Sequence, residues 1–302
     1  MKRTIKLNRL LLLLVVMNSF MACSNPKSTD SPVEKTEPAR IISLHGSITE
    51  ILFELGLGDQ IVGLDVTSTF PADCEKLPKL GHVQQLNPEG IMALNPTIVF
   101  VEEAMIESQV LQTLAKSDIK IMPIKIGRDL SAPIEAAKQI VAALAIDKSS
   151  LINKLEEKIE ANKKELENLK AAQVAEPKVL FIYARGAKTL MVSGKNTPID
   201  AMIQLAGGQN AIREFEDFKP LTPEALLQAT PDVILLFDSG LQSLADTEHG
   251  VDALQGLLNI PGIATTPAAK SGRIISMDGQ YLSGFGPRVG KAAIELAEAL
   301  SK

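Results

Sequence analysis

The sequence predicts an α/β fold in which two Rossmann-like lobes are bridged by a single long α-helix. Three observations support this prediction. Short β-branched runs alternate with helical patterns on both sides of the midpoint of the chain, as in parallel sheets covered by helices. A highly charged helical segment separates the two series. A stretch of sequence from the first half of the chain also recurs, without a gap, in the second half.

The composition is that of a folded protein with room for two cores. The chain has 302 residues, about twice a typical domain. Hydrophobic residues make up 45% and charged residues 22%, which disfavours disorder and a polytopic membrane protein. The formal net charge is −5, and the one cationic cluster lies at 2–9. The composition therefore argues against a nucleic-acid partner, because phosphate binding needs clustered cations and base stacking needs aromatic side chains.

The first 22 residues are typical of an export signal. A cationic start precedes an apolar run at 10–17, well short of the about 20 residues that span a bilayer. The small Ala22 before Cys23 resembles a bacterial lipoprotein signal, whose cysteine is acylated. We therefore expect a signal peptide at 1–22, a flexible tether at 23–38 and a periplasmic, membrane-anchored lipoprotein. Ordinary secretion with a free Cys23 is the alternative.

The N-terminal lobe is expected at 39–147. A β-branched run at 40–44 precedes His45-Gly46 and then Ser47-Ile-Thr-Glu50, a capping-box pattern that opens an apolar helix. Strand patterns and helical patterns alternate after it. The expected strands are 61–64, 97–101 and 120–124, and the expected helices are 88–94, 106–117 and 130–146.

The segment 148–173 is expected to form the linking helix. Its apolar residues recur at helical spacing, and charged residues fill the remaining positions. At 1.5 Å per residue such a helix is about 37 Å long, roughly the width of a lobe. It therefore suits a strut between two domains, with a long surface helix of a single domain as the alternative.

The C-terminal lobe, expected at 174–302, repeats the pattern of the first. A strand pattern at 178–183 is followed by a helix with Thr197 as cap and Pro198 at its first position. Residues 86–100 align with 221–235 without a gap, and their Leu, both Pro and Glu are identical. Two similar lobes, exported and tethered, indicate a substrate-binding protein with its cleft between the lobes.

Blocks spread over the mature chain carry a resemblance to a known family. They are Ser-Leu-His-Gly-Ser-Ile-Thr-Glu (43–50), the Leu-Gly-His-Val-Gln-Gln-Leu-Asn-Pro-Glu-Gly stretch within 77–90, and the blocks at 191–194, 200–211, 218–224 and 284–288. In this order they resemble the substrate-binding proteins of bacterial ABC importers for haem, cobalamin and iron-siderophores, most closely the haem-binding subfamily. The resemblance implies haem as ligand and delivery to an inner-membrane permease dimer with its ATPase. Siderophore and cobalamin binders share the architecture and remain alternatives.

The resemblance implies that His82 is the axial iron ligand. Ferric haem needs an O, N or S ligand, cations for its propionates and apolar walls. His82 follows Gly81 in a loop where the haem-binding motif normally has a tyrosine. A neutral imidazole can bind iron but favours the ferric state less than phenolate does. A solvated loop histidine is the alternative.

Further residues are expected around the ligand. His45, at the carboxyl end of the first strand, is a candidate contact or supporting donor, and otherwise a turn residue before a helix cap. Arg185 lies where some haem binders have a second ligand, but a guanidinium stays protonated, so we expect it to clamp a propionate. Arg288 is either a second clamp or a cap of the last helix. Met191, Tyr281 and Phe285 are expected as ligand walls, with core packing as the alternative.

Glu89 and Glu224 hold equivalent positions in the repeat, each directly after a proline at the start of a helix. A carboxylate stabilises the positive end of its helix, and this local role suffices to explain both. In the family that the chain resembles, a surface glutamate on each lobe docks onto arginines of the permease. Two symmetric acids suit a two-fold partner.

The sequence gives little support for an enzyme. Gly56-Leu-Gly58 follows a helix pattern and so is no dinucleotide fingerprint, and Walker, Gly-x-Ser-x-Gly, His-Glu-x-x-His and paired-cysteine motifs are absent. Cys74 and His249 are expected in loops without a chemical role. We therefore predict a non-enzymatic binding protein, with a lipid-anchored hydrolase that has a dispersed site as the alternative from another class.

Overall fold

A computed structural model describes residues 38–246 and 248–302. The expected signal peptide, Cys23 and almost all of the expected tether lie outside the described residues. In the described part, no helix combines the length and the apolar character that a membrane crossing requires.

The N-terminal half, before the linking helix, is built on a four-stranded parallel sheet in the order β2-β1-β3-β4. Because parallel neighbours need crossover connections, helices alternate with the strands, as predicted. The strands are β1 (Ile41–Ser43), β2 (Ile61–Leu64), β3 (Ile98–Glu102) and β4 (Lys120–Ile124). The helices are α2 (Gly46–Glu54), α3 (Pro88–Met92), α4 (Gln109–Leu114) and α5 (Ala132–Leu144).

The start of α2 differs from the expected capping box. His45 is the N-cap, and its Nδ1 accepts a hydrogen bond from the backbone N–H of Ser47. The Ser47 hydroxyl instead donates to the carbonyl of Gly284, and the carboxylate of Glu50 binds Arg288. The two residues that suggested a local cap therefore make contacts with residues far along the chain.

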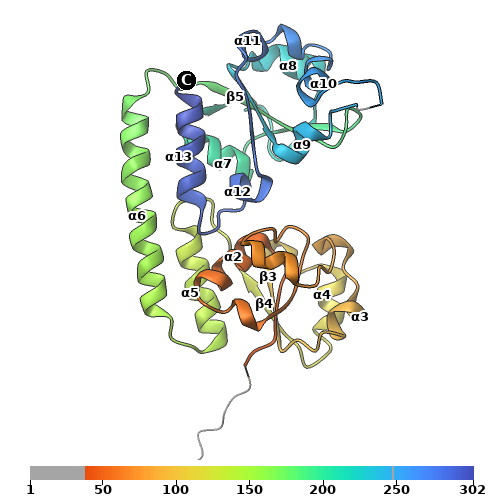
Figure 1. The fold of residues 1–302 in the computed structure, drawn as a ribbon, viewed down its shortest axis with the longest axis vertical. Coiled ribbons are helices and arrows are strands. Elements are labelled where there is room, and N and C mark those ends of the chain that lie inside the picture. Colours follow the sequence, from red (N-terminus) through yellow and green to blue (C-terminus); the bar gives the residue numbers. More distant parts are fainter. Residues whose placement is uncertain (1–37, 247) are drawn as a thin grey trace, which may run out of the picture. The chain divides into compact units, whose positions relative to one another are not determined.

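Helix α6 (Ser149–Ala172) is the predicted linking helix. It begins and ends within a residue of the expected segment and buries one side, which includes Leu155, Ile159 and Leu166. Figure 1 shows it running beside both halves, packed against α5 and the final helix α13 (Val289–Leu300). The fold class predicted from the sequence is confirmed.

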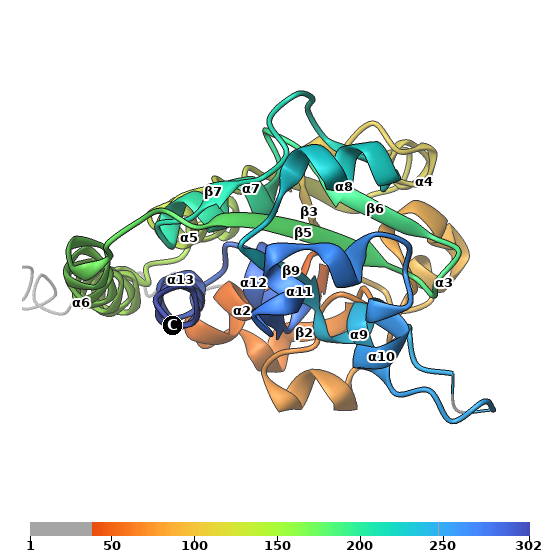
Figure 2. The ribbon, with the colours of Figure 1, turned by 90° about the horizontal axis from the view of Figure 1, so that it is seen from above.

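The C-terminal half has a six-stranded sheet in which β9 and β6 flank β5, as Figure 2 shows. Strands β10, β9, β5 and β7 are parallel, whereas β6 runs antiparallel to β5 and β8, which the sequence did not predict. The strands are β5 (Lys178–Ala184), β6 (Leu190–Ser193), β7 (Gln209–Asn210), β8 (Phe218–Pro220), β9 (Val233–Phe237) and β10 (Ile274–Met277). Besides α13, the helices are α7 (Pro198–Leu205), α8 (Pro223–Ala229), α9 (Asp238–Gln242), α10 (Ala253–Leu258), α11 (Pro267–Lys270) and α12 (Gly279–Ser283).

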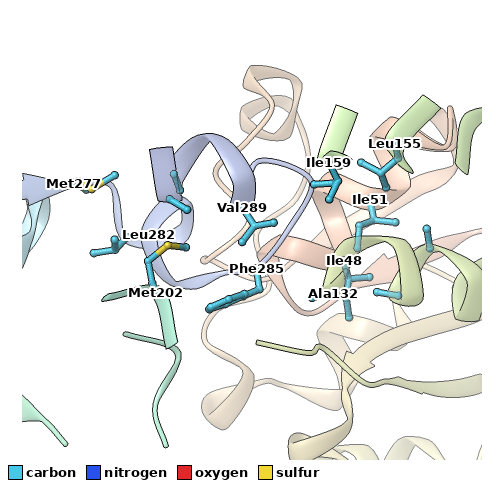
Figure 3. Close-up of a cluster of buried hydrophobic side chains, with 14 of the residues drawn as sticks. Ile48, Ile51, Ala132, Leu155, Ile159, Met202, Met277, Leu282, Phe285 and Val289 are labelled. Carbon is cyan, nitrogen blue, oxygen red and sulfur yellow. The ribbon is translucent and has the colours of Figure 1, made fainter. Parts of the chain in front are cut away.

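One buried apolar cluster includes residues of both halves and of α6. Figure 3 shows Ile48 and Ile51 of α2, Ile159 of α6, and Phe285 and Val289 from the C-terminal half packed in the same region. Phe285 is only 2% exposed, so its packing is that of a core residue and not of a ligand wall. The halves thus share a continuous core next to the linking helix.

Candidate functional site

Three of the predicted site residues line the same cavity. The cavity has a volume of about 430 Å³, which is within the usual range for small-molecule sites. His45 follows β1, His82 lies in the loop after β2, and Arg185 follows β5 of the other sheet. The carboxyl ends of parallel strands are where α/β folds place ligands. The remaining lining residues are Leu44, Asp65, Thr67, Val83, Gln85, Glu102 and Met105.

The loop that carries His82 is fixed by its backbone. The N–H of Leu80 donates to the carbonyl of Leu64 (2.7 Å), and the N–H of Val66 donates to the carbonyl of Gly81 (3.1 Å). Gly81 has a φ of 97°, a left-handed conformation that glycine adopts without strain. His82 itself is exposed, and its imidazole makes no hydrogen bond with any side chain that the structure describes, which excludes that of Gln84. Backbone hydrogen bonds therefore hold the loop from which the imidazole reaches the cavity.

The imidazole of His45 accepts a hydrogen bond at the start of α2. Its Nδ1 lies 3.3 Å from the backbone nitrogen of Ser47 and accepts that N–H, so a neutral ring carries its proton on Nε2. That Nε2 lies 3.7 Å from Oε2 of Glu102, at the end of β3. In this arrangement His45 acts as a donor, since binding iron through Nε2 would require that proton to leave.

The cavity is acidic on the side of the N-terminal half. Asp65 is 2% exposed, and its carboxylate accepts hydrogen bonds from the hydroxyls of Thr67 and Ser68 and from the N–H of Thr67. Glu102 adds a second carboxylate to the lining. These carboxylates give this wall a negative charge, which favours a cationic group beside it. Neither acid was predicted from the sequence, although each ends or directly follows a buried strand.

Arg185, which lines the cavity, lies beside an aromatic cluster. Its Cζ lies 5.5 Å from the ring centroid of Tyr183, which is near the end of β5. The half-buried Tyr183 ring makes edge-to-face contacts with Phe237 and Phe218, at centroid distances of 6.0 and 6.4 Å. Met191 on β6 pairs directly with Tyr183. The cluster was missed from the sequence, although the 181, 183, 185 alternation along the strand indicates it.

Arg288 and Tyr281 do not line this cavity. The Arg288 guanidinium donates to both oxygens of Glu50, at 2.9 Å from Nε and 2.6 Å from Nη2. Its Cζ lies 3.9 Å from the centroid of the Phe70 ring and 4.9 Å from that of Tyr281. Burial raises the pKa of Tyr281 to about 12, with Glu295 adding to the effect. Arg288 thus makes a contact between the halves in which its guanidinium is paired with a buried carboxylate, and Tyr281 lies beside it.

The remaining predicted residues lie at the surface or in the core. Glu89 and Glu224 are exposed in the first turns of α3 and α8. His249 is exposed and pairs with Asp246, with 2.7 Å between Nδ1 and Oδ2. Cys74 is fully buried.

The chain belongs to the periplasmic binding protein family, whose model matches residues 41–281. The solved structure of the periplasmic haem-binding protein RhuT from Roseiflexus sp. RS-1, in its apo form, is 38% identical with a TM-score of 0.80. That match covers 87% of this chain and 98% of that one. A structure of the periplasmic haem-binding protein BhuT with two haems is 30% identical, with a TM-score of 0.78 and the same coverage.

Curated relatives point to the same transport class. The ABC transporter substrate-binding lipoprotein YvrC of Bacillus subtilis is 25% identical over 88% of this chain and 81% of its own length. A vitamin B12-binding protein of Vibrio parahaemolyticus is 24% identical over 97% of this chain and 96% of its own length. The family is thus one of substrate-binding proteins.

Proposed function

We propose that this chain binds haem and delivers it to the permease of an ABC importer. The observation that carries the proposal is the meeting of His82, Arg185 and two carboxylates in one cavity at the carboxyl ends of strands from both sheets. The similarity to haem-binding proteins, at 38% and 30% identity over nearly their full length, supports the same ligand. The protein acts by binding and release, with no chemical step.

His82 supplies the first axial ligand to iron. Its free imidazole on a fixed loop suits this role, because a coordinating nitrogen must carry a lone pair and point into the site. His45 supports the bound group as a donor through Nε2. The acidic wall formed by Asp65 and Glu102 complements the positive charge of the ferric centre.

The C-terminal half supplies the opposite side of the ligand. Arg185 lines the cavity and forms charge-assisted hydrogen bonds with a propionate. Tyr183, beside it, supplies a phenol oxygen as the second axial ligand, since ferric iron accepts phenolate and the guanidinium compensates the phenolate charge. Phe218, Phe237 and Met191 extend an apolar wall next to Tyr183.

The delivery step uses the surface acids and the anchor. Glu89 and Glu224 dock onto cations of a two-fold permease whose ATPase drives import. A lipid on Cys23 holds the protein at the membrane on the periplasmic side. The similarity to a substrate-binding lipoprotein supports this anchor.

Vitamin B12 is the second candidate ligand, because full-length relatives carry that name. A corrin ring is also a flat metal macrocycle with axial sites, but it carries amide side chains where haem has two propionates. Arg185 therefore favours haem, since a guanidinium gains more from a carboxylate than from an amide. The test is an absorption titration of the purified protein with haemin, cobalamin and a ferric siderophore in parallel. Saturable binding of haemin alone supports the proposal, and saturable binding of cobalamin alone refutes it.

A further inference from the structure

The repeat seen in the sequence is also a repeat in the structure. Helix α3 precedes β3 and helix α8 precedes β9, and both strands lie inside their sheets. The caps also match, because the side chain of Asn87 accepts from the N–H of Glu89 and that of Thr222 accepts from the N–H of Ala225. After the helices, Asn95 and Thr230 hold equivalent left-handed conformations, with φ of 45° and 39°. The two units therefore match in the positions of the helix cap, the left-handed residue and the strand.

Each unit exposes a large apolar side chain at the same position. Met92 is 42% exposed and Leu227 is 70% exposed. Each lies three residues after the surface glutamate of its unit, Glu89 or Glu224, and so on the same helix face. A carboxylate and an apolar side chain thus form an adjacent pair, and the pair occurs once in each half.

Folding does not account for these pairs. A carboxylate in the first turn stabilises its helix, but an exposed Met or Leu gains little from the folded state. Single exposed apolar residues are common, whereas the same exposed position in both copies of a repeat indicates a shared use. Neither glutamate has an ion-pair partner within 4 Å among residues 38–246 and 248–302. Both members of each pair are therefore free to contact a partner.

We propose that Glu89 with Met92, and Glu224 with Leu227, form two equivalent docking pairs for a two-fold symmetric permease. The proposal rests on the proposed function. Each permease subunit presents a cation for the glutamate and an apolar recess for the neighbouring side chain, because two matching pairs fit two copies of one surface. The apolar side chain excludes water from the adjacent ion pair, which strengthens it. Leu227 contributes more than Met92, since more of its surface is available for burial.

The experiment compares Met92→Ala, Leu227→Ala and the double variant with Leu254→Ala, a control on α10 that is 47% exposed and lies outside the repeat. Binding to the purified permease–ATPase complex in lipid nanodiscs is measured with and without haemin, and haemin titration of each free variant is run alongside. Each docking substitution is expected to weaken permease binding about tenfold, because burial of one such apolar side chain changes the affinity by roughly a factor of ten. The loss should be larger for Leu227→Ala than for Met92→Ala. Leu254→Ala and all haemin affinities are expected to stay unchanged.

Unchanged permease binding by the double variant, or an equal loss in Leu254→Ala, overturns the docking pairs. A self-association of the wild type that the double variant abolishes, seen by sedimentation, overturns them as well, because the apolar side chains would then serve a dimer. If the wild type takes up no haemin but its permease binding still depends on Met92 and Leu227, the haem assignment fails and the docking pairs stand.

Discussion

Arg288 binds both carboxylate oxygens of Glu50, a residue 238 positions earlier in the chain. Glu50 is only 4% exposed, so the pair connects α2 to the segment before α13 from within the protein. The same segment is held by a hydrogen bond from the Ser47 hydroxyl to the carbonyl of Gly284, and Nε2 of Gln280 donates to the Ser47 oxygen at 3.0 Å. These contacts join the two halves beside their shared core.

Removal of the guanidinium is expected to be costly. In Arg288→Met the carboxylate of Glu50 stays buried without its partner, and loss of one member of a buried pair typically costs about 3–5 kcal/mol. Urea unfolding should report a free energy of unfolding lower by that amount, while the exposed Arg213→Met serves as control. A change below about 0.5 kcal/mol would show that the pair adds nothing to stability.

The cost of Arg288→Met is also expected to depend on pH. Burial raises the pKa of Glu50 above its ordinary value, and the hydrogen bonds and charge of Arg288 partly offset this rise. A raised folded-state pKa means that the folded protein binds the proton more tightly, so stability from this group is present at low pH and lost as pH rises through the folded-state pKa. Without Arg288 the pKa of Glu50 rises further. The difference in stability between variant and wild type should therefore shrink as pH falls from 7 towards 4; a constant difference contradicts this account.

Tyr183→Phe tests the second axial ligand. The substitution keeps the aromatic ring and its contacts with Phe218 and Phe237, but it removes the phenol oxygen. We expect the haemin complex to lose its phenolate-to-iron absorption band and to bind haemin about tenfold more weakly, since one iron ligand is lost. Met191→Leu, which changes the neighbouring side chain on β6 without removing a proposed oxygen ligand, provides the control. A spectrum identical to that of the wild type would restrict Tyr183 to the ligand wall.

Glu89→Ala combined with Glu224→Ala separates docking from helix stabilisation. Each carboxylate stabilises its helix by only about 0.3–1 kcal/mol, so the double variant should remain folded and bind haemin normally. Uptake of haem by cells that depend on the protein should fall sharply, because the permease loses both charge contacts. If the double variant instead unfolds at much lower urea concentration, the helix-end role is sufficient to explain both residues.

Much of the fold was predictable because its signals are local. The strand patterns, the charged linking helix and the repeated helix-to-strand unit each depend on neighbouring residues, and the structure contains all of them. The antiparallel β6 and β8 were not predicted, because short strands give weak patterns and their pairing depends on the turn after Arg185. The pattern Ser47 to Glu50 was misleading for a similar reason, since both side chains bind residues more than 230 positions away.

The candidate site was predicted in part. His82, His45 and Arg185 follow strand patterns in the sequence, and in the structure they line one cavity, as the strand-end rule indicates. Arg288 and Tyr281 lie outside this cavity. Arg288 pairs with the buried carboxylate of Glu50, a contact that forms only in the folded chain, and Tyr281 lies beside Arg288. Tyr183 was not predicted as a site residue, because a tyrosine in a strand is usually a core residue. Its contact with Arg185 is seen only in the structure.

Iron binding by His82 is tested by the Soret spectrum of the purified protein with one equivalent of haemin, compared with that of His82→Ala. We expect a shifted Soret band for the wild type and loss or a large displacement of that band in the variant. The spectrum of His249→Ala should match that of the wild type, because the imidazole of His249 pairs with Asp246 at the surface. An unchanged spectrum in His82→Ala would contradict the proposal that this imidazole holds the iron.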